Sequence, residues 1–203
     1  MRISRPLAWF LALGCSVAAR ALPAEPPPAA ATVQGLCDAL ISVMKEGPAT
    51  TFVGREEALA PEIRLDFDLA AMSRIVVGPA WRSFSAGDKQ EVTAAFSDYS
   101  IASYAQRFKG YSGERFEVDP VPSALPNGDC IVHTKLHTGD PEPVQLDYMM
   151  RVRDGRWRII DVFLSGTISE LAARRSEYSL VLRTGGSRAL VDLLRKKTAE
   201  LGR

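Results

Sequence analysis

The sequence predicts an α+β domain, with helices at both ends of the chain and an antiparallel sheet between them. In residues 32–110 and 167–203, apolar residues recur every three or four positions, which is typical of amphipathic helices. The residues in between alternate apolar and polar side chains, as half-buried strands do. Because 203 residues with 46% hydrophobic and 24% charged residues are ordinary for one globular unit, we expect a single domain.

Residues 1–21 are predicted to be a cleavable signal peptide that directs export to the periplasm. Arg2 and Arg5 precede an apolar run over residues 7–19, and small residues flank Arg20, as a signal peptidase requires. The run is shorter than the roughly 20 residues that span a bilayer. A lipoprotein box ending at Cys15 is the alternative, although Ala12 stands where that box prefers a larger aliphatic residue.

The mature chain is predicted to begin with an extended leader over residues 22–31, which is rich in proline and alanine. The folded domain then covers residues 32–203. Its first helix is expected over residues 32–46, where Gly47-Pro48 ends it. A second helical segment is expected over residues 55–64.

A third helix opens near Asp66 and ends before Gly78-Pro79, and Trp81 anchors the next turn. The fourth helix starts with a capping box between Ser85 and Asp88, in which each side chain satisfies a free amide of the first turn. Glycines at 110 and 113 end this helix.

Four strands are predicted over residues 114–121, 130–137, 144–153 and 156–164. The last two form a hairpin, since Asp154-Gly155 supplies the positive φ angles of a two-residue turn. The fourth strand ends as a nearly continuous apolar run around Asp161. One face of the third strand is expected to carry Val144, Leu146, Tyr148, Met150 and Val152.

Two helices close the domain. The first is predicted to start at a capping box from Thr167 to Glu170 and to end at Gly185-Gly186. Ser187 is expected to cap the last helix. A curved antiparallel sheet between such helices predicts a cone like that of nuclear transport factor 2 (NTF2), in which the helices enclose an apolar pocket.

An ordered set of motifs spread over residues 32–197 resembles the MlaC family, also called the toluene-tolerance auxiliary component of ABC transporters. The motifs are Phe67-Asp68-Leu69, Gly78-x-x-Trp81, Phe96 with Tyr104, Asp147-Tyr148, Asp154-Gly155-x-Trp157, Asp161-Val162, Gly166-x-x-Ser169, Arg175-Ser176-x-Tyr178, and Gly185-Gly186 with Leu190. The resemblance implies a periplasmic lipid carrier without a cofactor. It would shuttle phospholipid between the inner and outer membranes, together with an inner-membrane lipid transporter complex and an outer-membrane partner.

The segment from Gly166 to Tyr178 is more similar to the hopanoid-associated branch of that family, called HpnM. The resemblance therefore implies either a phospholipid or a hopanoid-type lipid as the ligand. The transport system would be of the ABC or RND type.

Such a carrier needs a closed apolar lining, since each buried CH₂ group contributes about 0.8 kcal/mol. The polar headgroup of the lipid must stay in contact with water at the mouth of the pocket. Plain core packing explains the same large residues equally well. The candidate lining residues are Trp81, Phe96, Tyr99, Tyr148, Met150, Trp157, Ile159 and Phe163.

Two other functions are open. NTF2-like cavities also host isomerases and dehydratases that use a buried carboxylate as a general base, and Asp161 is the candidate here. Its structural alternative is a strand-end carboxylate that accepts backbone hydrogen bonds or pairs with Arg158 or Arg175. A structural adaptor for a membrane complex would instead use exposed apolar patches and no cavity.

The remaining residue types predict neither a metal site nor a nucleic-acid partner. The only histidines, His133 and His137, share a strand face with Lys135, and we expect that face to be solvated. Cys37 and Cys130 are expected as separately buried thiols, although export would permit a disulfide. A formal net charge of +1 gives no reason to expect nucleic-acid binding.

The basic residues of the last helix allow two interpretations. The run over residues 195–197 is Arg-Lys-Lys and suits the negative end of the helix dipole. Together with Arg188 it could also meet anionic headgroups or an acidic partner.

Overall fold

The computed structural model describes residues 28–203, so the predicted signal peptide and most of the predicted leader lie outside the described residues. The first helix begins at Pro28, four residues earlier than expected. Ala29 and Ala30 are buried in the core, and the end of the predicted leader is therefore part of the domain. No helix in the described part of the chain is both long and apolar enough to span a membrane.

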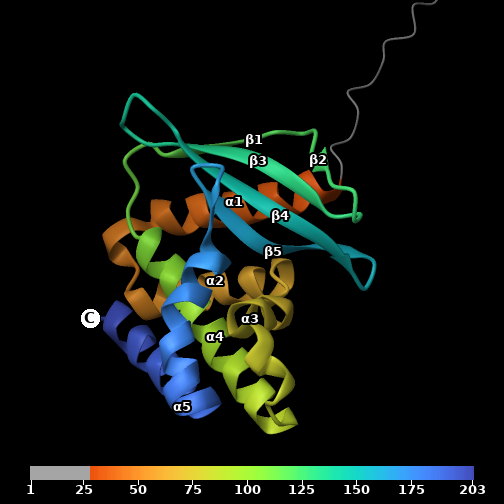
Figure 1. The fold of residues 1–203 in the computed structure, drawn as a ribbon. Coiled ribbons are helices and arrows are strands. Elements are labelled where there is room, and N and C mark those ends of the chain that lie inside the picture. The colour runs from red at the N-terminus through yellow and green to blue at the C-terminus, as the bar shows by residue number, and fades with distance from the viewer. Residues whose placement is uncertain (1–27) are drawn as a thin grey trace, which may run out of the picture.

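Over residues 28–203, five helices and two short 3₁₀ turns lie on one side of a single sheet (Figure 1). The α-helices are α1 (Pro28–Glu46), α2 (Phe52–Asp66), α3 (Leu69–Val77), α4 (Ala86–Arg107) and α5 (Glu170–Leu201), and the turns are η1 (Gly47–Ala49) and η2 (Gly78–Arg82). In Figure 1, α1 runs along the underside of the sheet and the other helices lie below it.

The sheet is antiparallel, with the order β1-β3-β4-β5-β6, and β2 pairs with β3. Its strands are β1 (Arg115–Val118), β2 (Ser123–Ala124), β3 (Cys130–His137), β4 (Val144–Arg153), β5 (Arg156–Leu164) and β6 (Ile168–Ser169). The α+β prediction is confirmed: helices precede and follow an antiparallel sheet and pack against it. The short strands β2 and β6 were not predicted.

The helix starts explain how the chain enters α4 and α5. The predicted capping box at α4 is present, with Ser85 accepting from the Asp88 amide at 3.0 Å and Asp88 accepting from the Ser85 amide. The box predicted from Thr167 to Glu170 is wrong. Pairing of β6 with β5 keeps the chain extended up to Ser169, so Ser169 is the N-cap and accepts from the Ala172 amide at 2.9 Å.

A sharp kink at Gly186 divides α5 into two segments, as the glycine pair predicts. Gly186 has φ 61° and ψ −149°, a conformation that is essentially restricted to glycine. The hydroxyl of Ser187, expected to cap the second segment, instead donates to Asp88 at 2.6 Å. This contact ties the second segment of α5 to the start of α4.

A β-bulge in the hairpin decides which residues of β5 face the helices. Tyr148 pairs with Val162, but Met150 pairs with Ile159, so β5 carries one extra residue between them. The alternation of β5 therefore changes phase at the bulge. Ile159 faces inward before it, Val162 and Leu164 face inward after it, and Phe163 lies opposite Asp147 on the other face.

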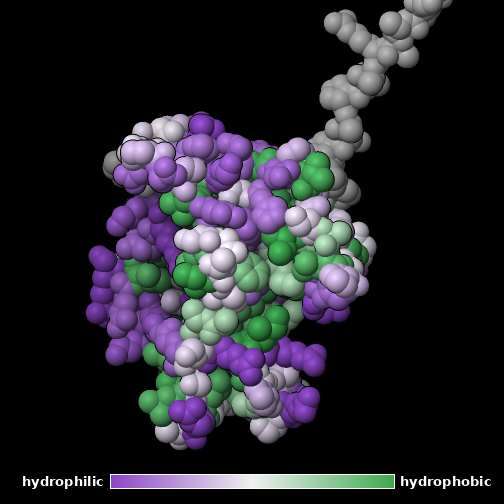
Figure 2. Space-filling model, turned by 45° about the horizontal axis from the view of Figure 1, so that its top comes forward, coloured by the Kyte–Doolittle hydropathy of each residue, from purple (hydrophilic) through white to green (hydrophobic). Residues whose placement is uncertain are grey.

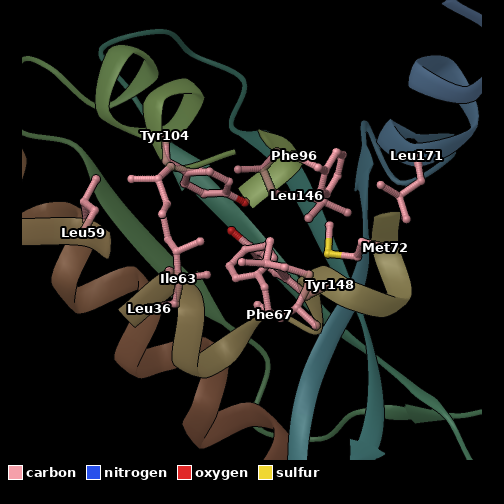
Figure 3. Close-up of a cluster of buried hydrophobic side chains, with 14 of the residues drawn as sticks. Leu36, Leu59, Ile63, Phe67, Met72, Phe96, Tyr104, Leu146, Tyr148 and Leu171 are labelled. Atoms are coloured by element: carbon pink, nitrogen blue, oxygen red, sulfur yellow. The ribbon is translucent and has the colours of Figure 1, made fainter. Parts of the chain in front are cut away.

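The core lies between the inner face of the sheet and the helices. Figure 3 shows Phe67, Met72, Phe96 and Leu171 gathered around Tyr148. On the outer side, Figure 2 shows hydrophilic residues over most of the visible face, with hydrophobic residues in separate patches between them. The expected thiols are both buried and free, at Cys37 and Cys130.

Candidate functional site

An apolar pocket of about 410 Å³ lies between the end of α4 and one end of the sheet. This volume falls within the roughly 300–1,000 Å³ that is common for small-molecule sites. We call it the apolar pocket. It is lined by Tyr104, Arg107, Phe108, Leu136, Val144, Leu146, Tyr148, Val162 and Leu164.

Cross-strand pairs build the sheet side of the apolar pocket. Leu146 lies opposite Leu164, and Tyr148 lies opposite Val162, which places all four side chains on one face. Exposure falls along β4, from 43% at Val144 to 8% at Leu146 and 1% at Tyr148. The pocket therefore opens at Val144 and is deepest at Tyr148.

A row of aromatic rings forms the helical side. Tyr104 and Phe108 stack with ring centroids 5.8 Å apart, because Phe108, the C-cap of α4, follows Tyr104 by one helical turn. The ring centroid of Phe108 is also 6.1 Å from that of Phe116 in β1, and the ring centroid of Tyr104 is 5.5 Å from that of Phe67. The row connects the pocket to the core.

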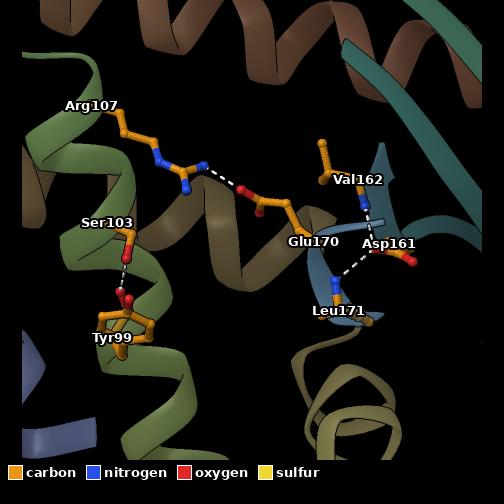
Figure 4. Close-up of polar contacts among 7 residues, drawn as sticks. All are labelled: Tyr99, Ser103, Arg107, Asp161, Val162, Glu170 and Leu171. Carbon is orange, nitrogen blue, oxygen red and sulfur yellow. Dashed lines mark hydrogen bonds and ion pairs between the residues drawn. The ribbon is translucent and has the colours of Figure 1, made fainter. Parts of the chain in front are cut away.

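Arg107 is the only charged residue in the lining. It forms an ion pair with Glu170 at the start of α5 (Figure 4), and its side chain is 48% exposed. Because Arg107 is held at the mouth by the carboxylate of Glu170, and the other lining residues are uncharged, the interior of the pocket carries no charge.

The two tyrosines keep the interior neutral. Burial is the main cause that raises the pKa of Tyr104 and of Tyr148 above the ordinary phenol value, so both hydroxyls stay protonated at neutral pH. In Figure 3 these two hydroxyls point toward one another. They are the only polar side-chain groups among the lining residues besides Arg107.

A family description, MlaC protein, matches residues 34–196, which is most of the chain. The chain belongs to the MlaC family. A solved structure with the same fold comes from Ralstonia solanacearum and is described as a phospholipid-binding protein in complex with a phospholipid. It shares 22% sequence identity and a TM-score of 0.75, covering 87% of this chain and 100% of its own.

The structure disperses the eight predicted lining residues of this MlaC-family chain. Tyr148 alone lines the apolar pocket. Phe96, Met150 and Ile159 are fully buried in the core, and half-buried Trp157 packs against that core.

The other three lie apart from the pocket. Tyr99 packs against the Arg174 guanidinium, 4.7 Å from its ring centroid, and Trp81 lines a separate groove next to η2. Phe163 is on the opposite face of β5, because the bulge reverses the alternation from which its position was inferred. For all seven residues outside the pocket, contact with a ligand stays a prediction.

Most of the observed lining was missed by sequence reasoning. Val144 and Leu146 share the predicted face of β4 with Tyr148, so that alternation could have identified them. Tyr104 lies in the last turn of α4 and Phe108 is the C-cap of this helix, but no pattern in the sequence reveals that this end of α4 meets β3 to β5. That meeting depends on tertiary packing.

The carboxylate of Asp161 holds the start of α5 (Figure 4). It accepts from the Val162 amide at 2.8 Å and the Leu171 amide at 3.2 Å, and from the Ser169 hydroxyl. No ion pair with Arg158 or Arg175 forms among residues 28–203. This geometry fits the structural role and leaves little lone-pair capacity for a general base.

The histidines on β3 also have local partners. The His133 ring is 3.0 Å from Asp147, and the His137 ring is 3.1 Å from Glu117. Over the described residues, no three His, Cys, Asp or Glu side chains are grouped so that they could hold a metal ion.

Proposed function

We propose that this protein is a periplasmic lipid-binding carrier that holds an acyl chain or another apolar lipid tail in the apolar pocket. The observation that carries the proposal is the combination of an uncharged interior, walled by Leu146, Tyr148 and Val162, with a single charge at the mouth. An apolar tail would lie inside, and a polar headgroup would stay at the mouth beside Arg107. The phospholipid complex of the Ralstonia solanacearum structure supports the same ligand class.

A carrier must compensate for the hydrophobic cost of removing a lipid from a membrane. At about 0.8 kcal/mol for each CH₂, an acyl chain of about 16 carbons loses on the order of 12 kcal/mol in water. A pocket lined by Leu, Val and aromatic side chains offsets that cost, since few polar groups interrupt its surface.

The ligand we propose is a phospholipid or a hopanoid-type lipid. The MlaC family membership favours phospholipid, and the segment from Gly166 to Tyr178 favours the hopanoid-linked alternative. In either case the carrier would work between the inner and outer membranes, with an inner-membrane transporter complex of the ABC or RND type and an outer-membrane partner.

Mass spectrometry of lipid that co-purifies with the protein tests the proposal. Mature protein, purified from the periplasm of a Gram-negative host without detergent, is expected to carry stoichiometric lipid. Leu164→Trp replaces an aliphatic side chain of the pocket wall with a bulky indole ring and should therefore remove that lipid. Leu180→Trp is the matched control, because Leu180 is 60% exposed on α5 and does not line the pocket.

The position of the blocking residue matters. Met150 is fully buried in the core, so a tryptophan there would test overpacking and not lipid binding. The proposal would be contradicted if the folded wild-type protein carried no lipid. It would also be contradicted if the Leu164→Trp and Leu180→Trp variants carried equal amounts of lipid.

A further inference from the structure

A second cavity, of about 1010 Å³, lies between α3, η2, the start of α5 and the β4–β5 hairpin. It is separate from the apolar pocket, because it uses the opposite end of β4, near Arg151 and Arg153. We call it the arginine groove. Its arginines are Arg74, Arg82, Arg151, Arg153, Arg158 and Arg175.

Carboxylates balance only part of this charge. Arg151 makes two hydrogen bonds to Asp129, at 2.8 and 2.6 Å, and Arg153 contacts Asp68 at 3.2 Å. Asp154 is the other acidic residue in the lining. Since the whole chain has a formal net charge of only +1, the excess of positive charge is a local property of this groove.

The other arginines have unused donors. Arg74, Arg82 and Arg175 form no ion pair within residues 28–203, and all three are exposed. The Nε of Arg158 is buried without a hydrogen-bond partner, and its Nη1 reaches only the Arg64 carbonyl at 3.4 Å. A buried donor without an acceptor is costly. Because protein atoms cover this Nε, the exposed guanidinium groups of Arg74, Arg82 and Arg175 are the donors open to a ligand in the groove.

The backbone makes room for one of these arginines. A Cβ atom at Gly78 would lie 2.9 Å from Nε of Arg175 and 3.1 Å from its Nη2. Gly78 also has a φ of 66°, which L residues rarely adopt. The guanidinium of Arg175 therefore crosses from α5 to the groove directly over a residue that has no side chain.

We propose that the arginine groove is a second ligand site, which binds phosphate groups. The planar guanidinium presents paired N–H donors that match two oxygens of a phosphate. Trp81, Ile75 and Pro79 provide an apolar margin beside the arginines. The phosphate could belong to a lipid headgroup or to a soluble phosphate compound, and the site does not depend on lipid binding in the apolar pocket.

The test compares two double variants of the mature protein with the wild type. Arg74→Gln/Arg175→Gln removes two groove charges, and Arg188→Gln/Arg195→Gln removes two exposed charges of α5 outside the groove. Calorimetric titration at one fixed ionic strength uses inorganic phosphate and pyrophosphate as soluble probes. Co-sedimentation uses vesicles of phosphatidylcholine with and without phosphatidylglycerol.

We expect the groove variant to bind about tenfold more weakly and the control variant to bind like the wild type. Loss confined to the soluble probes identifies a soluble phosphate ligand, and loss confined to the phosphatidylglycerol vesicles identifies a headgroup. Loss of both means that the site accepts either source. No binding by the wild type, or equal loss in both variants, overturns the proposal. If the groove variant fails to fold, Arg82→Gln at the exposed edge replaces it.

Discussion

Asp66, at the end of α2, is a buried carboxyl group, and its Oδ2 has no hydrogen-bond partner in the described chain. Burial, followed by the nearby Glu62, raises its pKa from 3.8 to about 7, although Arg156 and Arg158 act in the opposite direction. The folded state therefore holds a proton that the unfolded state releases at lower pH. The resulting stability is present below pH 4 and is lost as the pH rises through about 7.

Asp66→Asn is expected to remove this pH dependence, since the amide is neutral at every pH. Each pKa unit corresponds to about 1.4 kcal/mol, so the variant should gain stability relative to the wild type between pH 5 and pH 8. Urea unfolding at both pH values measures the difference. Asp192→Asn, at an exposed position on α5, is the control. An Asp66→Asn effect that is equal at the two pH values would contradict the assignment.

Cys37 is predicted to be chemically inert in the folded protein. Burial, with a smaller effect of Asp38, raises the pKa of its thiol to about 12, and the thiolate is the reactive form. In the Cys130→Ser variant of the mature protein, which lacks Cys15, Cys37 should react with a disulfide reagent only at the rate of unfolding. Reaction in denaturant supplies the control. Rapid reaction under native conditions would show that α1 opens locally at this site.

At the scale of elements, Asp161 joins β5 to α5. Asp161→Ala removes its hydrogen bonds to Ser169 and Leu171, so the free energy of unfolding should fall by roughly 1.5–3 kcal/mol. Lipid loading should persist, because Asp161 does not line the apolar pocket. Chemical unfolding and lipid analysis of the same sample separate the two effects. Full stability with loss of an enzymatic turnover would instead restore the isomerase hypothesis.

The kink in α5 gives a second prediction for an element. Gly186→Ala should destabilise the fold by roughly 1–3 kcal/mol, because alanine does not tolerate φ 61° with ψ −149°. Gly87→Ala in the first turn of α4 is the matched change, since its new Cβ would make only an ordinary contact with Ser85. That variant should be as stable as the wild type or slightly more stable. Thermal unfolding of the pair decides the point.

The elements were predictable because each has a local signature. Apolar periodicity marks α1 to α5, and Asp154-Gly155 marks the hairpin turn. Ser169 as the cap of α5 was not predictable from spacing, since Thr167 and Glu170 make the better motif and only pairing of β6 with β5 excludes it. The bulge in β5 was also not predictable from the sequence of that strand, because a change of register depends on how two strands pair.

The candidate site was less predictable for a related reason. Large apolar residues such as Phe96 and Tyr148 look alike in sequence, yet one fills the core and the other borders a cavity. Which side of a residue faces empty space depends on how α4 meets the sheet. The arginine groove was also hidden, because its residues come from α3, η2, the hairpin and α5.

For the whole molecule, lipid and stability should be linked. A ligand that binds only the folded state stabilises it, by about 2.7 kcal/mol when its concentration is a hundred times Kd. Protein that is unfolded, stripped of lipid and refolded should therefore melt at a lower temperature, and added lipid should reverse the shift. Leu164→Trp should show no such response. A melting temperature that is independent of lipid in the wild type would count against the carrier.

The bulge near Ile160 has a consequence for how this protein can evolve. Before it, β5 contributes Trp157 and Ile159 to the packing of the domain, and after it, Val162 and Leu164 to the pocket wall. The strand thus contributes to the core on both sides of the bulge, and only the part after the bulge also forms the pocket wall. Under the proposed function, substitutions at Val162 or Leu164 would change the pocket wall and so the lipid tail that it accepts, while Trp157 and Ile159 keep the packing of the domain.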